Sequence, residues 1–121
     1  MARAPAPLEK TIQRSVIAYL KARDITTVHV PNGSVLAGGP RERAMQTNAL
    51  KAMGMRPGFP DLVLLGRNGR VGFMEVKREG EKQSEAQIHW HGALEYLGHR
   101  YAVVRSIEDA AETLERWGWA A

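Results

Sequence analysis

The chain has 121 residues, of which 44% are hydrophobic and 25% charged, and this length predicts one compact domain over residues 1–121 rather than a multi-domain enzyme. It contains no cysteine, which excludes disulfides and thiolate metal sites and fits a reducing compartment. No apolar run approaches the ~18 residues needed to span a bilayer, and residues 1–7 lack the apolar stretch of a signal peptide. We therefore expect a soluble, cytoplasmic protein that has no membrane partner.

The basic residues are concentrated in the first half of the chain. The formal net charge is +4, but residues 1–60 carry nine basic and three acidic side chains, whereas residues 61–121 carry eight basic and ten acidic ones. Clustered Lys and Arg attract polyanions such as nucleic acids. We expect the first half to build the surface that faces such a partner.

Hydrophobic periodicity predicts the elements of the first half. Apolar residues recur at helical spacing between residues 7 and 22, which predicts an amphipathic helix. The β-branched run over residues 25–30 predicts a strand, and a glycine-rich loop follows over residues 33–39. Pro40 favours the start of a second helix, which Gly54 is expected to end.

The second half predicts a hairpin followed by a helix, a strand and a last helix. The apolar run 62–65 is typical of a strand covered on both faces, and residues 71–77 form its expected partner. Ser84 and Ser106 are expected to cap helices on either side of a strand over residues 101–104. The apolar face of the first of these helices is expected to comprise Trp90, Ala93, Leu94 and Leu97. The order of elements predicts the α/β class, with a mixed central sheet flanked by helices.

The geometry of the hairpin decides which residue lies opposite Asp61. A two-residue loop over residues 68–69 places Asp61 opposite Val76, whereas a three-residue loop over residues 67–69, with its glycine left-handed, places it opposite Glu75. We predict the second register. Directly opposed residues have Cβ atoms about 5 Å apart, so the two carboxylates would lie side by side.

Such a carboxylate pair predicts a site for a hard divalent cation. Residues two apart in a strand share a face, so Glu75 and Lys77 project together. Mg²⁺ or a similar ion between Asp61 and Glu75 would relieve their repulsion. Lys77 could then orient or deprotonate a water for attack on a phosphodiester, or stabilise the charge that develops at phosphorus. The alternative is an exposed Glu-Lys ladder on a half-solvated strand.

Several segments along the chain carry a family resemblance. They are Glu9 and Gln13, Val30-Pro-Asn32, Gly58-Phe-Pro-Asp61, Phe73-Met-Glu75-Val-Lys77, Gln87 and Tyr101-Ala-Val-Val-Arg-Ser106. In this order they resemble the virus-type replication-repair nuclease (VRR-NUC) domain of the PD-(D/E)xK superfamily. The resemblance implies a restriction-endonuclease-like core and a DNA endonuclease that depends on Mg²⁺ or Mn²⁺.

The resemblance also implies roles for individual residues and partners. Asp61 and Glu75 would be metal ligands, Glu9 a further acidic residue supporting the metal, Lys77 the catalytic lysine, and Gln87 a polar residue of the site. Compact members of the family resemble Holliday-junction resolvases, which implies a homodimer acting on branched DNA in replication, repair or recombination, in a phage or prophage setting. A monomer would favour nicking or flap cleavage instead.

Two of these residues have a simpler interpretation. Gln87 follows Ser84 at the spacing of a capping box, in which the glutamine amide binds the backbone at the helix start. Glu9 lies in the first turn of its helix, where a carboxylate stabilises the helix dipole. Both interpretations stay open beside the catalytic ones.

The remaining motifs concern contact with DNA and the binding of nucleotides. Arg41, Arg43 and Lys51 of the second helix, together with Asn32, are candidates for contact with the DNA backbone. The loop over residues 33–39 lacks the Gly-Lys-Ser/Thr ending of a phosphate loop, so we expect no nucleotide cofactor. A non-catalytic DNA-binding module or specificity subunit with the same fold is the alternative to an enzyme.

Overall fold

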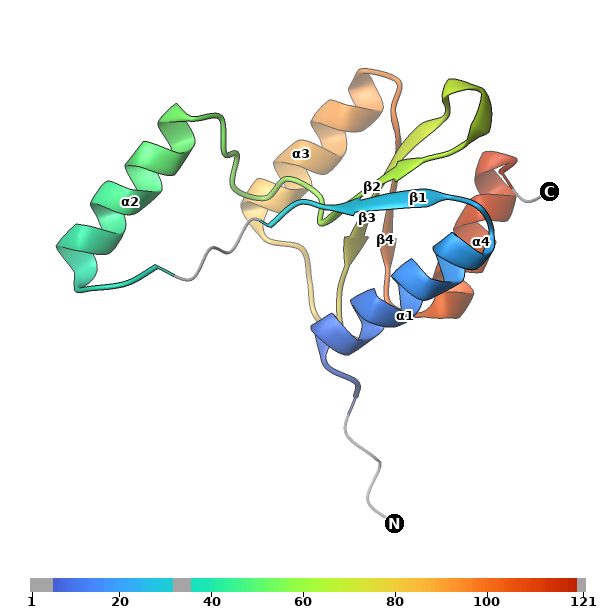
Figure 1. Ribbon diagram of the computed structural model, residues 1–121, viewed down its shortest axis with the longest axis horizontal. Coiled ribbons are helices and arrows are strands. Elements are labelled where there is room, and N and C mark those ends of the chain that lie inside the picture. Colours follow the sequence, from blue (N-terminus) through green and yellow to red (C-terminus); the bar gives the residue numbers. More distant parts are fainter. Residues whose placement is uncertain (1–5, 32–35, 120–121) are drawn as a thin grey trace, which may run out of the picture.

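A computed structural model describes residues 6–31 and 36–119 of the chain (Figure 1). The helices and strands follow one another as α1 (Glu9–Ala22), β1 (Thr26–His29), α2 (Pro40–Ala52), β2 (Leu62–Leu65), β3 (Val71–Val76), α3 (Glu85–Tyr96), β4 (Arg100–Val104) and α4 (Ile107–Trp117). This is the predicted order of elements. No helix in the described ranges is long and apolar enough to cross a bilayer.

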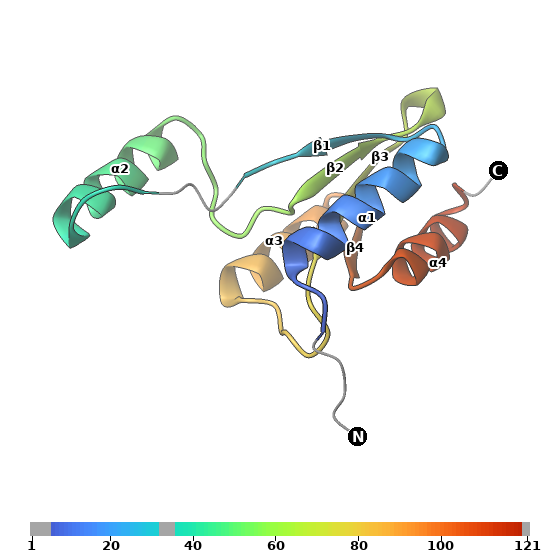
Figure 2. The ribbon, with the colours of Figure 1, turned by 60° about the horizontal axis from the view of Figure 1, so that its bottom comes forward.

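The four strands form one mixed sheet in the order β1-β2-β3-β4. The pairs β1–β2 and β2–β3 are antiparallel, and β3–β4 is parallel because α3 carries the chain back between them. Helices α1 and α4 cover one face of the sheet, and α3 covers the other (Figure 2). The predicted α/β fold with a mixed central sheet is confirmed.

Each face of the sheet carries its own hydrophobic cluster, and β3 contributes to both. On the side of α1 and α4, the buried residues include Ile12, Val16, Leu20, Leu62, Leu64, Met74, Val76, Ala110, Leu114 and Trp117. On the side of α3, Phe73, Leu94 and Tyr101 pack with Phe59, Val63, Trp90 and Val103. Since side chains alternate along a strand, Glu75 belongs to the α3 side, where the cluster of aromatic rings lies.

The hairpin has the predicted three-residue loop. Leu62 pairs with Met74, so the next pair outward sets Asp61 opposite Glu75. At the other end of the hairpin, the Gly66 N–H donates to the Arg70 carbonyl at 2.9 Å. Residues 67–69 form a short 3₁₀ turn in which the glycine is left-handed, with φ of 73°. The predicted register of the hairpin is confirmed, and its continuation by one residue places Asp61 opposite Glu75.

Two predictions about burial are wrong. Leu65 at the end of β2 is exposed, because α3 does not extend over that corner and the second face of the strand is left partly open. Leu97 is exposed as well, since α3 ends at Tyr96 and Leu97 is the C-cap residue, where the chain leaves the helix. Trp90 and Leu94 do pack against the sheet as predicted.

Helix α2 stands away from the sheet in both views (Figures 1 and 2). It begins at Pro40 and ends before Gly54, as predicted, but none of its residues is buried. Met45 and Met53 are 64% and 86% exposed. Because α2 contributes nothing to the core, packing against the sheet does not explain its presence.

Candidate active site

A tight turn over residues 58–61 delivers Asp61 to the start of β2. Gly58 has φ of +81°, and a Cβ on this residue would lie 2.5 Å from the backbone carbon of Ala86 at the start of α3. The Phe59 ring packs edge-on against Phe73 at a centroid distance of 5.7 Å. Only glycine fits this backbone approach, so the turn is fixed between α3 and the sheet.

Asp61 is held in place by the strand that lies opposite. Its Oδ2 accepts a hydrogen bond from the backbone N–H of Val76 at 2.8 Å. Burial raises the pKa of Asp61 above its usual value, and the Val76 N–H, His29 and Lys77 partly offset this effect. The carboxylate therefore has a fixed position but is desolvated.

Glu75 is the most deeply buried ionisable group of the site, with no exposed surface. Its Oε1 accepts a hydrogen bond from the Tyr101 hydroxyl at 2.6 Å. Its Oε2 is buried and has no hydrogen-bond partner among the described residues. Burial raises the pKa of Glu75, and the charge of Asp61 raises it further, whereas the Tyr101 hydroxyl, the charge of Lys77 and the side-chain amide of Gln83 lower it.

Lys77 continues the line of β3 just beyond the end of the strand. Its backbone N–H donates to the carbonyl of Val104 at 3.0 Å, which extends the pairing with β4 by one residue. The side chain is almost completely buried. Its positive charge lowers the pKa of both Asp61 and Glu75, so the ammonium acts directly on the carboxylate pair.

Glu9 lies in the electrostatic field of this pair. Burial raises the pKa of Glu9 first, and the charge of Asp61 is the next largest cause. The guanidinium of Arg78 donates to the carbonyls of Pro7 and Ala6 at 3.2 and 3.1 Å, which ties the start of α1 to the end of β3. No three His, Asp or Glu side chains within residues 6–31 and 36–119 gather closely enough to hold one ion. Glu9 as a metal ligand stays a prediction.

The carboxylate pair nevertheless fits a hard divalent cation. Mg²⁺ is commonly bound through one or two carboxylates and keeps several waters, so Asp61 and Glu75 are a sufficient protein contribution. The unpartnered Oε2 of Glu75 is an oxygen of the type such an ion prefers, in a place where an unsatisfied charge is costly. An ion bound there would satisfy this oxygen and reduce the repulsion between the two carboxylates.

Gln87 belongs to the cap of α3. Its Oε1 accepts from the backbone N–H of Ser84 at 2.8 Å, and the Gln87 N–H donates to the Ser84 hydroxyl at 3.2 Å. The capping-box interpretation is therefore confirmed. Because its carbonyl oxygen is used at the cap, a catalytic role for Gln87 gains no support from this geometry and stays a prediction.

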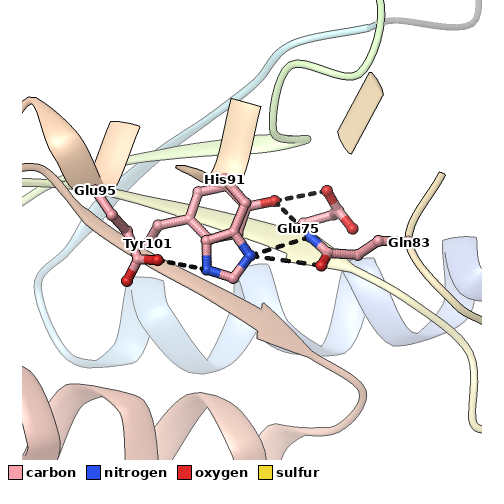
Figure 3. Close-up of polar contacts among 5 residues, drawn as sticks. All are labelled: Glu75, Gln83, His91, Glu95 and Tyr101. Atoms are coloured by element: carbon pink, nitrogen blue, oxygen red, sulfur yellow. Dashed lines mark hydrogen bonds and ion pairs between the residues drawn. The ribbon is translucent and has the colours of Figure 1, made fainter. Parts of the chain in front are cut away.

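Two residues to which the sequence analysis gave no role in the site contact it. Tyr101 of β4 donates to Glu75, and the side-chain amide of Gln83, in the loop before α3, donates to the Tyr101 oxygen at 3.3 Å (Figure 3). Burial and the neighbouring Glu75 raise the pKa of Tyr101 far above its usual value, so the phenol stays protonated and able to donate. The alternation of Tyr101 and Val103 in a predicted strand was the available signal, since a buried tyrosine hydroxyl needs a partner.

The candidate DNA-binding residues lie apart from the carboxylates. Arg41, Arg43 and Lys51 are exposed along α2, the helix that projects from the body. Asn32 lies outside the described residues. The structure thus assigns three of the four candidates to one solvent-facing helix.

The fold and site together define a class of α/β proteins that gather paired carboxylates and a lysine at one end of a mixed sheet. Within this class, the chain belongs to the VRR-NUC domain family, whose model matches residues 9–108. Two solved structures described as a "VRR_NUC domain" and a "VRR_NUC domain protein" have the same fold. The first has a TM-score of 0.66 at 22% identity and covers 90% of this chain and 96% of its own. The second has a TM-score of 0.73 at 19% identity and covers 98% and 93%.

A phage protein is similar over a shorter stretch. It carries the name "Putative nuclease p44", comes from Acyrthosiphon pisum secondary endosymbiont phage 1, and is 39% identical over 51 residues. These residues are 42% of this chain and 55% of that protein, so the chain spans about half the length of this curated relative. The family predicted from the motifs is confirmed.

Proposed function

We propose that the protein is a metal-dependent DNA endonuclease that holds Mg²⁺ or Mn²⁺ between Asp61 and Glu75. Membership of the VRR-NUC family and the name of the phage relative support a nuclease. The observation that carries the proposal is the buried, unpartnered Oε2 of Glu75, across from Asp61 and within the field of Lys77. A buried carboxylate oxygen without a hydrogen-bond donor is costly to the fold, and a bound cation would satisfy it.

Each side chain of the site has a task in phosphodiester hydrolysis. The reaction joins a water oxygen to phosphorus, breaks one phosphorus–oxygen bond of the backbone and leaves a proton on the departing alcohol. A bound divalent ion would polarise the phosphate and lower the pKa of water. Asp61 and Glu75 fix the place of the reaction at the end of the hairpin. The Lys77 ammonium can donate hydrogen bonds to the attacking water or to the phosphate oxygens as negative charge develops there.

The exposed basic helix α2 supplies a second contact with the substrate. Arg41, Arg43 and Lys51 each offer a positive charge to the phosphate backbone, and such contacts are independent of base sequence. None of the residues of α2 is buried, so the helix can change position on the DNA without exposing core residues. We propose that α2 binds the backbone of one DNA arm while the scissile phosphate lies at Asp61 and Glu75.

The substrate is proposed to be branched DNA, cut by a homodimer. One domain of this size offers one carboxylate pair, and two symmetric cuts in a four-way junction require two such sites related by a two-fold axis. We propose a setting in replication, repair or recombination inside a bacterial cell, and the phage origin of the relative supports a gene carried by phage or host.

A cleavage assay on matched substrates tests the proposal. A labelled four-way junction is compared with linear duplex, single-stranded and flap DNA of the same sequence, in Mg²⁺, in Mn²⁺ and in chelator. Asp61→Asn is the inactive control, because it removes a charge at a position held by the Val76 N–H. Paired symmetric cuts in the junction, dependent on metal and on Asp61, are the expected result. Cuts only in flap or duplex DNA would retain the nuclease and reject the resolvase.

The non-catalytic alternative makes the opposite prediction in the same assay. A DNA-binding module or specificity subunit would bind the substrates and cut none of them in any metal. Asp61→Asn would then leave its DNA affinity unchanged or increase it slightly, through lost repulsion. Metal-independent cutting, or cutting that persists in Asp61→Asn, would reject the proposed site.

A further inference from the structure

A continuous polar chain connects Glu75 with the surface of α3 (Figure 3). From Glu75 Oε1 it passes through the Tyr101 hydroxyl at 2.6 Å and the Gln83 amide at 3.3 Å from that hydroxyl. Gln83 Nε2 lies 3.3 Å from His91 Nδ1, and His91 Nε2 lies 2.9 Å from Glu95 Oε1. His91 and Glu95 are neighbours one turn apart on α3, but the other three side chains come from β3, β4 and the loop before α3, so only the tertiary fold brings them together.

The direction of donation is defined at the Tyr101 end of this chain, whereas His91 Nδ1 lies near both Gln83 Nε2 and Gln83 Oε1, at 3.3 and 3.5 Å. An ionised Glu95 carboxylate can only accept, so His91 donates to it from Nε2. The Gln83 Nε2 group has two hydrogens, of which one is donated to the Tyr101 oxygen and the other is available for a second acceptor. The Tyr101 oxygen then accepts from Gln83, and its own hydrogen points to Glu75.

Packing also fixes the position of the Tyr101 ring. The His91 and Tyr101 rings stack with their centroids 4.1 Å apart and an interplanar angle of 20°. Tyr101 also lies opposite Phe73 in the parallel register of β3 and β4 and is 95% buried, with 5% of its surface exposed. The hydroxyl therefore reaches Glu75 from a buried ring that is packed against His91 and the sheet.

We propose that Tyr101, oriented by Gln83, is a positioning residue that holds Oε1 of Glu75 and leaves Oε2 as the oxygen presented to the metal. The inference rests on the proposed function of Glu75 as a metal ligand. A glutamate side chain has two equivalent oxygens and several rotatable bonds, so an unrestrained one would present either oxygen in many orientations. The hydrogen bond from the Tyr101 hydroxyl fixes Oε1 of Glu75. Oε2 is buried and has no hydrogen-bond partner among the described residues, so it is the oxygen left for the metal.

Groups that hydrogen-bond to metal ligands commonly change metal affinity or activity by about 10- to 100-fold when they are removed. Tyr101→Phe deletes the hydroxyl and retains the ring that stacks on His91. Gln83→Met deletes the amide that orients the hydroxyl and retains the length of the side chain. We expect Tyr101→Phe to weaken Mn²⁺ binding by about 10-fold or more, and Gln83→Met to weaken it by a smaller factor.

Calorimetric titration of the full chain with Mn²⁺, without DNA, measures this directly. Tyr96→Phe is the matched control, since it makes the same chemical change on a side chain that is 90% exposed on α3. Chemical denaturation of each variant accompanies the titration and shows that metal affinity is compared among folded proteins. If Tyr101→Phe does not fold, Gln83→Met decides the question, because Gln83 lies in a loop and is only partly buried.

The possible outcomes separate this inference from the proposed function. Weaker Mn²⁺ binding in Tyr101→Phe and Gln83→Met, with Tyr96→Phe unchanged, supports the positioning role. Binding within two-fold of the unmodified protein in both folded variants overturns the role but leaves the metal site intact. An unmodified protein that binds no Mn²⁺ rejects the proposed function and the inference together.

Discussion

Replacing Gly58 with alanine tests whether the close approach of the turn to α3 holds the site together. Two costs add at this position. The φ of +81° is a left-handed conformation that costs a residue with a Cβ about 1–2 kcal/mol. The new Cβ would also lie 2.5 Å from the Ala86 carbon and 2.7 Å from its carbonyl oxygen, both backbone atoms that cannot rotate away. Overpacking of this kind typically costs a further 1–3 kcal/mol.

Gly69→Ala separates the two costs. Gly69 has φ of +73°, almost the same backbone conformation, but a Cβ there would meet nothing within 4 Å. Gly69→Ala should therefore lower the free energy of unfolding by about 1–2 kcal/mol, which is the conformational cost alone. Gly58→Ala should lower it by about 2–5 kcal/mol, the sum of both costs.

Urea denaturation of the two variants beside the unmodified protein gives these values, and a cleavage assay on the folded variants gives the effect on the site. Gly58→Ala should lose activity even where it is folded, because Asp61 follows three residues later and moves with the turn. Gly69→Ala lies at the far end of the hairpin and should cleave normally. Equal destabilisation by the two substitutions would refute the argument that the contact with Ala86 fixes the turn.

Three further predictions concern the charges. Glu75→Gln should abolish cleavage and raise the free energy of unfolding at pH 7, because burial disfavours the charged form of Glu75 that the neutral amide replaces; denaturation of the metal-free variant checks this, and a loss of stability would contradict it. In the metal-free unmodified protein, Glu75 and Asp61 bind protons more tightly when folded, so stability should fall as pH rises from about 4 through their raised pKa values, and denaturation across pH should show a weaker fall in Glu75→Gln. Replacing both Arg43 and Lys51 with glutamine should reduce the salt dependence of DNA binding by about two units of slope on logarithmic axes, and an unchanged slope would remove α2 from the DNA interface.

The pairing of Asp61 with Glu75 could be predicted because local chemistry fixes it. The three-residue loop with a left-handed glycine sets the register of the hairpin, and the register alone decides which side chains lie opposite each other. Lys77 follows from the two-residue period of the strand. The capping box at Ser84 could also be predicted, since it depends on a spacing of three residues.

The partners of Glu75 could not be predicted in the same way. Tyr101 is 26 residues away in the sequence, and its hydroxyl meets the carboxylate only because β4 joins β3 in a parallel register that no turn specifies. Gln83 lies in a loop that carries no periodicity. The position of α2 away from the sheet could not be predicted either. Met45 and Met53 are hydrophobic and therefore resemble core residues in the sequence, but both are exposed in the structure.

The most direct test of the account is the rate of metal-dependent cleavage by Glu75→Ala beside Glu79→Ala. The two substitutions remove the same group four residues apart, from a buried position across from Asp61 and from an exposed loop position. The account predicts that the unmodified protein and Glu79→Ala cut branched DNA in Mg²⁺ or Mn²⁺ and not in chelator, while Glu75→Ala cuts nothing. Cleavage by Glu75→Ala at the rate of Glu79→Ala would contradict the assignment of the active site.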